Sequence, residues 1–126
     1  RILEDCSRFN VVELAFDRWN ASQLVTNLTD EEVPMIAFGQ GFQSMSAPTK
    51  ELEKLVISQE IAHGYNPVMR WMAANVAVEQ DPAGNLKPSK KKSIERIDGI
   101  VALIMASGRA IQRKEQGTDF NGILFV

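Results

Sequence analysis

Val11-Val-Glu-Leu-Ala-Phe-Asp17 and Pro34-Met-Ile-Ala-Phe38 are the two stretches of this sequence that decide the fold. Both are short and mainly apolar, as is typical of buried strands. Between them, residues 20–28 place apolar side chains on one face of a helix, with Asn20 and Ser22 available to cap its start. A strand, a helix and a second strand in this order predict an α/β sheet with parallel neighbouring strands.

Helical patterns surround these strands. Apolar spacing predicts the end of a helix over residues 2–9, a helix from Pro48 to about residue 58, and another over residues 66–74. The turn-rich segment Asp81-Pro-Ala-Gly-Asn85 predicts a β-hairpin. A long helix is expected after the hairpin, ending at Gly117. Its expected apolar stripe consists of Ile94, Ile97, Ile100, Val101, Ile104 and Ile111.

Length and composition set the class of protein. A chain of 126 residues that is 44% hydrophobic and 24% charged suits one compact globular domain. The net charge of -2 excludes a whole-surface attraction to DNA, so any such contact requires a local basic patch. Cys6 is the only cysteine, which excludes an internal disulfide and a Cys-rich zinc site. No apolar run approaches the roughly 20 residues of a membrane span. Because the chain opens with Arg1, it is expected to be a piece of a longer protein.

Asp17 is the first candidate for chemistry. It closes the strand over residues 11–16 and precedes Arg18-Trp-Asn20. In open α/β sheets, ligands collect outside the carboxyl ends of the strands, so an acid there lies at the expected site. The alternative is that Asp17 caps the following helix or starts a turn.

Asp98 is the second candidate, within an otherwise strongly apolar helix. It shares a helical stripe with Ala102, Met105 and Arg109, and Gly99 follows it directly. Glycine in a helix interior costs about 1 kcal/mol relative to alanine, so Gly99 is expected to permit the close approach of another backbone, such as the sheet. An acid beside such a seam suits a metal ligand. The alternative is an exposed carboxylate in the first helical turn, favoured by the helix dipole.

Two carboxylates together would suit phosphodiester cleavage. This reaction needs charge neutralisation at the attacking and leaving oxygens, which two divalent ions about 4 Å apart provide. Carboxylate oxygens are hard ligands that suit Mg²⁺ or Mn²⁺. The sequence contains no Ser-His-Asp spacing, phosphate-loop signature or His-rich zinc pattern that would compete with this interpretation.

Basic side chains gather shortly before Asp98. The densest basic patch consists of Lys87, Lys90, Lys91 and Lys92. We expect this patch to contact the DNA backbone. The alternative is an ordinary solvated loop.

Histidine and the tryptophans allow weaker assignments. His63, the only histidine, could assist proton transfer or contact phosphate. The alternative is a structural hydrogen-bonding role. Trp19 and Trp71 lie within apolar patterns and are interpreted as core rather than base-stacking residues. The same core interpretation applies to Met69, Met72 and Met105.

Four segments match one known family in order and spacing. They are Leu14-Ala-Phe-Asp-Arg-Trp-Asn-Ala21, Gln40-Gly-Phe-Gln-Ser-Met-Ser-Ala-Pro-Thr-Lys-Glu-Leu-Glu53, His63-Gly-Tyr-Asn-Pro-Val-Met-Arg-Trp-Met72 and Ile97-Asp-Gly-Ile-Val-Ala-Leu-Ile-Met-Ala106. The first resembles a strand-end acid segment and the last a closing helix. Over residues 11–113 the sequence resembles the C-terminal nuclease domain of the terminase large subunit of tailed bacteriophages.

The resemblance implies an α/β fold with a ribonuclease-H-like mixed sheet flanked by helices and a β-hairpin before the last long helix. Residues 1–126 would form the C-terminal portion of one nuclease domain that lacks its opening strands. Asp17 would be the second active-site acid and Asp98 the last, both ligating catalytic Mg²⁺ or Mn²⁺. The family's first acid and the phosphate loop of its ATPase motor have no equivalent here. We therefore expect this chain alone not to be an ATPase and to be weak or inactive as a nuclease.

The implied activity is metal-dependent endonuclease cleavage of concatemeric double-stranded phage DNA during packaging, in the bacterial host cytoplasm. Through the longer protein, the implied partners are phage DNA, the terminase small subunit and the portal protein, with no membrane. Two alternatives stay open at this point. One is a non-catalytic module that docks onto portal or capsid components. The other is a decayed prophage remnant that keeps the fold without a working site.

Overall fold

The computed structural model describes residues 1–19 and 22–115, and it divides into two compact units. The first unit extends from Arg1 to Gly39 and the second begins at Gln40. The predicted assignment of all 126 residues to one portion of a single domain stays a prediction. Within the described ranges, no helix combines the length and apolar character that a membrane span needs.

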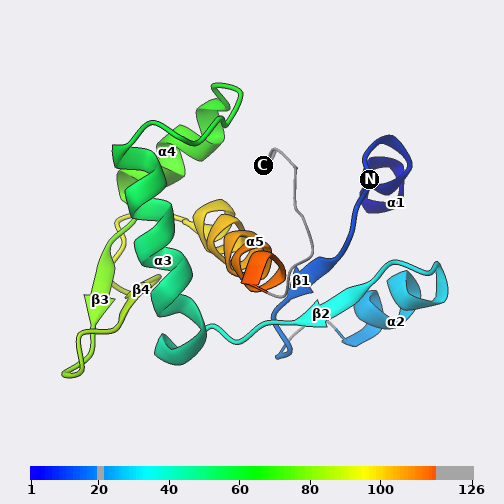
Figure 1. Ribbon diagram of the computed structural model, residues 1–126, viewed down its shortest axis with the longest axis horizontal. Helices are drawn as coiled ribbons and strands as arrows, with labels where there is room; N and C mark the ends of the chain where they lie inside the picture. Colours follow the sequence, from blue (N-terminus) through cyan, green and yellow to red (C-terminus); the bar gives the residue numbers. More distant parts are fainter. Residues whose placement is uncertain (20–21, 116–126) are drawn as a thin grey trace. The chain divides into compact units, whose positions relative to one another are not determined.

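The first unit is built on a parallel pair of strands. β1 (Leu14–Phe16) pairs with β2 (Met35–Ala37), with Ala15 opposite Ile36. Parallel strands need a crossover connection, and α2 (Ser22–Asp30) supplies it (Figure 1). The expected strand, helix and strand with parallel pairing are therefore confirmed, although both strands are shorter than the apolar runs.

The edges of the first unit agree only in part with expectation. α1 (Ile2–Arg8) confirms the opening helix, and an ion pair of 3.1 Å between Arg1 and Asp5 joins its first turn. The predicted capping of α2 by Asn20 and Ser22 stays a prediction, because Asn20 and the side chain of Ser22 lie outside the described residues.

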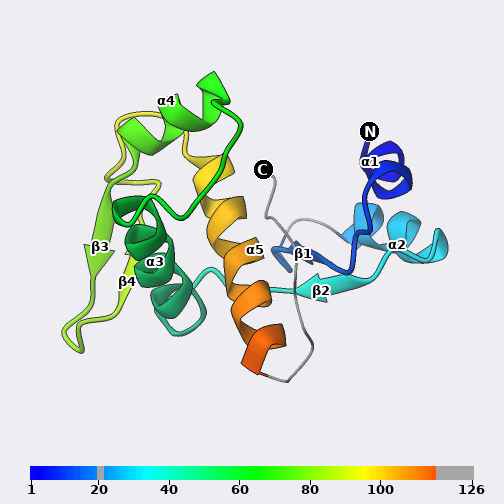
Figure 2. The ribbon, with the colours of Figure 1, turned by 45° about the horizontal axis from the view of Figure 1, so that its top comes forward.

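The second unit is built around a long helix. α3 (Phe42–Ile57) lies between a hairpin and α5 (Asp98–Glu115) in both ribbon views (Figures 1 and 2). The hairpin consists of β3 (Val78–Gln80) and β4 (Leu86–Pro88), which pair antiparallel as predicted. Ser46 of α3 accepts a hydrogen bond of 3.1 Å from the backbone N–H at the start of β4, which fastens the hairpin to the helix.

α4 (Pro67–Asn75) contacts the start of α5 (Figure 2). Asn66 caps α4 by accepting from the backbone N–H groups of Val68 and Met69, as the Asn-Pro start predicts. A Cβ at Gly99 would stand 2.8 Å from the Met72 sulfur. Gly99 therefore does permit a close approach, but by methionine side chains of α4 rather than by the sheet.

The core of the second unit includes Met45 of α3, Ile97 before α5 and Ile104 within it. Ile94 was expected in the same apolar stripe, and this is wrong: 84% of it is exposed, and α5 begins four residues later. Residues 89–93 form a hydrogen-bonded turn instead. Because Ile94 is not in a helix, its helical spacing from Ile97 does not place it on the buried face of α5. The predicted helix end at Gly117 lies outside the described residues.

The start of α3 also differs from expectation. The helix begins after Gly41, whereas the sequence placed Pro48 in the first turn. Pro48 lies inside the helix and is buried, as is Met45 in the turn before it. Burial of this apolar face offsets the backbone hydrogen bond that proline cannot donate.

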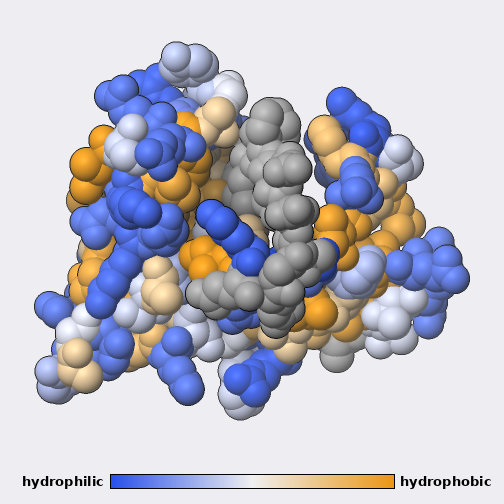
Figure 3. Space-filling model, viewed as in Figure 1, coloured by the Kyte–Doolittle hydropathy of each residue, from blue (hydrophilic) through white to orange (hydrophobic). Residues whose placement is uncertain are grey.

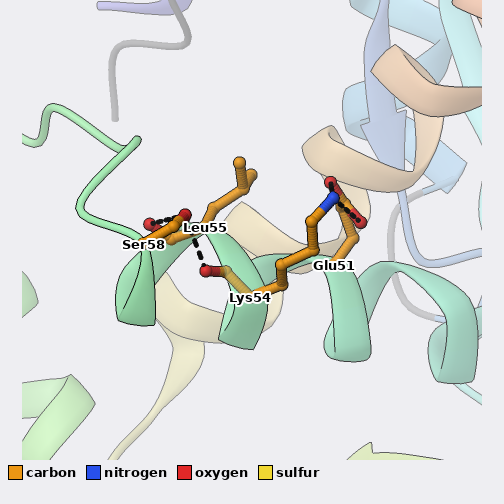
Figure 4. Close-up of polar contacts among 4 residues, drawn as sticks. All are labelled: Glu51, Lys54, Leu55 and Ser58. Carbon is orange, nitrogen blue, oxygen red and sulfur yellow. Dashed lines mark hydrogen bonds and ion pairs between the residues drawn. The ribbon is translucent and has the colours of Figure 1, made fainter.

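α3 ends in a regular cap. Gln59 takes a left-handed backbone with φ of 59°, and the Glu60 N–H donates to the Leu55 carbonyl at 2.9 Å, as in a Schellman motif. Ser58 Oγ adds bonds to the carbonyls of Lys54 and Leu55, and the Lys54 ammonium reaches both carboxylate oxygens of Glu51 (Figure 4). The helix end is thus held without a glycine.

The hairpin turn is organised by one carboxylate. Asp81 accepts hydrogen bonds from the side chain and backbone of Asn85 and from the backbone of Ala83. These bonds, with the Asn85 side chain first, hold the pKa of Asp81 below its ordinary value. Gly84 has φ of 81°, which this turn requires. Among the described residues the two strand pairs form separate sheets, so the ribonuclease-H-like detail stays a prediction.

Candidate functional site

Asp17 directly follows β1, at the carboxyl end of the parallel pair. Its side chain is half-buried, and Oδ1 accepts a hydrogen bond of 3.3 Å from the Trp19 N–H. Asp17 thus starts a turn, as the alternative interpretation expected. It makes no ion pair with any residue in the ranges 1–19 and 22–115. This strand-end carboxylate therefore has no ion-pair partner in the part of the chain that the structure describes.

Asp98 is the first residue of α5, and its side chain is 58% exposed. The Lys90 ammonium donates a hydrogen bond of 2.6 Å to Asp98 Oδ1. This bond and the charge of Lys90, with a smaller effect from Arg96, lower the pKa of Asp98. The position in a first helical turn is the one that the alternative interpretation expected, and the metal-ligand role stays a prediction.

The turn that carries Lys90 is fixed by two serines. Ser89 is buried, and its carbonyl accepts from the backbone N–H and the hydroxyl of Ser93. Ser93 Oγ in turn accepts from the backbone N–H of Ala77 at 3.0 Å. No motif singled out these serines, yet they hold the backbone of the basic patch in a defined turn.

The four predicted DNA-binding lysines fall into two groups. Lys87 is half-buried, pairs with Glu79 at 3.1 Å and lies over the Phe42 ring at 4.9 Å. This pairing lowers the pKa of Glu79. Lys90 is held by Asp98, as above. Of the four lysines, Lys91 and Lys92 are exposed and make no side-chain hydrogen bond or ion pair in the described part of the chain.

His63 lies between α3 and α4, with its ring 5.9 Å from that of Tyr65. It lines a pocket of about 760 Å³ whose other walls come from α3, α4, the hairpin and α5. The lining is mainly apolar, but His63 Nδ1 and the hydroxyl of Thr49 are buried there without a hydrogen-bond partner in the described chain. On the face shown in Figure 3, hydrophobic patches interrupt the hydrophilic surface over α3 and the hairpin. The pocket was not foreseen, because its walls are far apart in sequence.

The two tryptophans correct the sequence interpretation. Trp19 is 82% exposed and Trp71 is 46% exposed, so neither is a buried core residue. Apolar neighbours in the sequence suggested burial, but Trp19 lies in the turn after β1, where its side chain is exposed. Arg18 beside it is also exposed and has no hydrogen-bond or ion-pair partner among the residues described.

Asp17 belongs to the first unit and Asp98 to the second. The convergence of their carboxyl groups therefore stays a prediction. Within the described ranges, no three His, Cys, Asp or Glu side chains gather as a metal site. The donor chemistry still fits a hard divalent cation, because Asp17 has no paired cation in the described residues and Lys90 bonds to only one oxygen of Asp98.

Comparison with known proteins identifies relatives over nearly the whole chain. A family model described as "Terminase large subunit, endonuclease domain" matches residues 3–114. The large terminase subunit of Enterobacteria phage HK97 is 38% identical over 98% of this chain and 25% of its own length. Protein YmfN of Escherichia coli K12 is 37% identical over 93% of this chain and 27% of its own length.

A solved structure agrees with these matches. The crystal structure of the HK97 bacteriophage large terminase superposes with a TM-score of 0.78 at 37% identity. The superposition covers 86% of this chain and 23% of that chain. This chain thus spans about a quarter of the length of the relatives that it matches.

Proposed function

This chain belongs to the family of terminase large-subunit endonuclease domains, and on that premise we propose that it takes part in metal-dependent cleavage of concatemeric double-stranded phage DNA during packaging. The observation that carries the proposal is the family match over residues 3–114, a range that contains both Asp17 and Asp98. Because the chain spans about a quarter of its relatives, this activity is proposed for the longer protein.

In this proposal Asp17 and Asp98 hold Mg²⁺ or Mn²⁺. The bound ions would neutralise charge on the attacking and leaving oxygens of the phosphodiester. Asp17 suits this role because it follows a strand, lies in a turn and pairs with no cation among the described residues. Asp98 suits it because its side chain is 58% exposed and Lys90 bonds only to Oδ1.

Lys90 has a particular place in this site. It neutralises Asp98 in the structure through one carboxylate oxygen. A divalent cation at Asp98 would either share that carboxylate with Lys90 or displace the ammonium. A displaced Lys90 could then bind a DNA phosphate, as we propose for Lys91 and Lys92, which are already exposed. Lys87 would have to leave Glu79 to join them, and His63 is an auxiliary candidate from the pocket.

The partners and setting follow from the same family. We propose that the longer protein acts on phage DNA with the terminase small subunit and the portal protein, in the cytoplasm of the bacterial host. These assignments rest on membership of the terminase family rather than on any surface described above.

Metal titration of the longer protein tests this proposal. Mn²⁺ should raise the melting temperature of the wild type, and Asp98→Asn should abolish the rise because a carboxylate ligand is lost. Lys90→Gln is the matched control, since it breaks the same ion pair but leaves the carboxylate. Equal responses of wild type and Asp98→Asn would show that the metal assignment is wrong.

A non-catalytic docking role is the second candidate, and the apolar pocket of the second unit favours it. Its occupant would be a bulky apolar side chain of a portal or capsid component. Leu103→Trp would fill the pocket from α5. Loss of portal binding with unchanged DNA cleavage would support the docking role, and unchanged portal binding would exclude it.

A further inference from the structure

Trp19 is an unusual surface residue. Tryptophan is the largest apolar side chain, yet 82% of Trp19 is exposed. Its backbone N–H donates to Asp17 Oδ1 at 3.3 Å, so the turn that presents the indole is the turn that positions the candidate acid. The position of Trp19 is therefore tied to that of Asp17.

Arg18 and Trp19 together form an exposed pair at a strand end. Both follow β1 at the carboxyl end of the parallel pair, where ligands collect in open α/β sheets. Arg18 is exposed and makes no hydrogen bond or ion pair in the described residues. An exposed guanidinium and an exposed indole thus directly follow the same acid.

The chemistry of this pair fits a nucleic-acid strand. A guanidinium binds phosphate through two parallel hydrogen bonds. An indole packs its apolar face against a sugar and a base edge and requires no particular sequence. The net charge of -2 means that attraction to DNA has to come from local groups such as this arginine.

We propose that Arg18 and Trp19 form a DNA contact beside Asp17. Arg18 binds a backbone phosphate, and the Trp19 indole packs against the sugar and base of the adjoining nucleotide. The contact sets the register of the strand relative to Asp17, so Trp19 is a positioning residue. This inference rests on the proposed nuclease function, since it places the same substrate at the same site.

The chain contains two tryptophans, which permits a direct test. In a Trp71→Phe variant of the full chain, Trp19 is the only source of indole fluorescence. Addition of a short DNA duplex, with Ca²⁺ in place of Mg²⁺, should quench this emission and protect the indole from acrylamide. The reverse variant, Trp19→Phe, leaves Trp71 as a control whose emission should not respond. Trp19 already protected from acrylamide before DNA is added would overturn the proposal, because the indole would then lie in a protein contact.

Affinity measurements separate the two side chains. Trp19→Ala should raise the Kd for the duplex about tenfold, because the apolar contact of the indole with the sugar and base edge is lost, while Trp19→Phe keeps most of the affinity. Arg18→Gln should weaken binding and lower the slope of log K against log salt by about 1. Arg8→Gln, an equal loss of charge in the same unit, should leave that slope unchanged. Circular dichroism checks that each variant is folded.

The outcomes distinguish this inference from the proposed function. If the wild type binds DNA and Trp19→Ala binds equally well, the inference is wrong while the nuclease proposal stands. The inference is also wrong if the wild-type chain binds no DNA at all. The nuclease proposal is then judged separately by the Mn²⁺ response of Asp98 in the longer protein.

Discussion

The strand end that carries Asp17 and the helix start that carries Asp98 present the same side chain in opposite electrostatic settings. Asp17 is half-buried, and among the described residues a backbone N–H donates a hydrogen bond to it. Asp98 is exposed, and Lys90 neutralises it at 2.6 Å. The carboxylate at the strand end is therefore available to a cation, whereas the carboxylate at the helix start is already paired with a lysine of the preceding turn.

This difference separates the two proposed ligands. In the described part of its unit, no cation is paired with Asp17 that a divalent ion would have to displace. An ion at Asp98 competes with the Lys90 ammonium, and that turn is fixed by Ser89 and Ser93. Metal binding is thus expected to change the surroundings of Asp98 more than those of Asp17.

The largest expected effect is on catalysis. Asp17→Asn and Asp98→Asn should each reduce DNA cleavage by the longer protein at least about a thousandfold, which corresponds to roughly 4 kcal/mol of transition-state stabilisation. Cleavage of a duplex in Mg²⁺ is the measurement. Asp30→Asn, an exposed acid at the end of α2, is the matched control and should cut normally. If only one of the two variants lost activity, the aspartates would not share a role.

The next effect tests where α5 begins, and hence whether Asp98 lies at its start. Ile104→Ala should lower the free energy of unfolding by about 3 kcal/mol, because it leaves a cavity in the core. Ile94→Ala should change it by no more than about 0.5 kcal/mol, because Ile94 lies outside the helix and is exposed. Urea denaturation measures both. Similar losses would mean that the apolar stripe and the helix extend back past Asp98.

Much of this fold was predictable from local patterns. The order of helices and strands, the parallel pair and the hairpin follow from apolar spacing and from the turn residues Asp81 to Asn85, which act within a few positions of one another. The same spacing misled at Ile94, where a serine-based turn precedes the helix, and at Pro48, where burial extends α3 back past the proline. Both outcomes depend on contacts with residues that are distant in the sequence, which a local pattern does not include.

The position of Asp17 at a strand end was predictable, but the surroundings of the candidate residues were less so. Asp17 at a strand end could be read directly from the apolar run before it. The pairing of Lys90 with Asp98 and the exposure of Trp19 could not, because both depend on how the chain turns after its regular elements. The convergence of the two aspartates depends on the arrangement of the two units and stays a prediction.

The smallest effect concerns the ion pair itself. The folded-state pKa of Asp98 is lowered, so the pairing stabilises the fold above the unfolded-state pKa of about 3.9 and is lost as pH falls through the folded-state value. Lys90→Met should raise the pKa of Asp98, as read from the NMR titration of its carboxyl carbon. Because both side chains are more than half exposed, the stability change should not exceed about 1 kcal/mol and should shrink in high salt. An unchanged titration curve would mean that Lys90 does not hold this carboxylate in solution.

Anomalous X-ray diffraction from crystals of the longer protein grown with Mn²⁺ tests the central claim most directly. We predict manganese peaks bonded to oxygens of both Asp17 and Asp98, at about 2.2 Å as carboxylate ligands of such ions require. Manganese bound at neither residue, or the two carboxyl groups on opposite faces of the domain, would contradict a shared site.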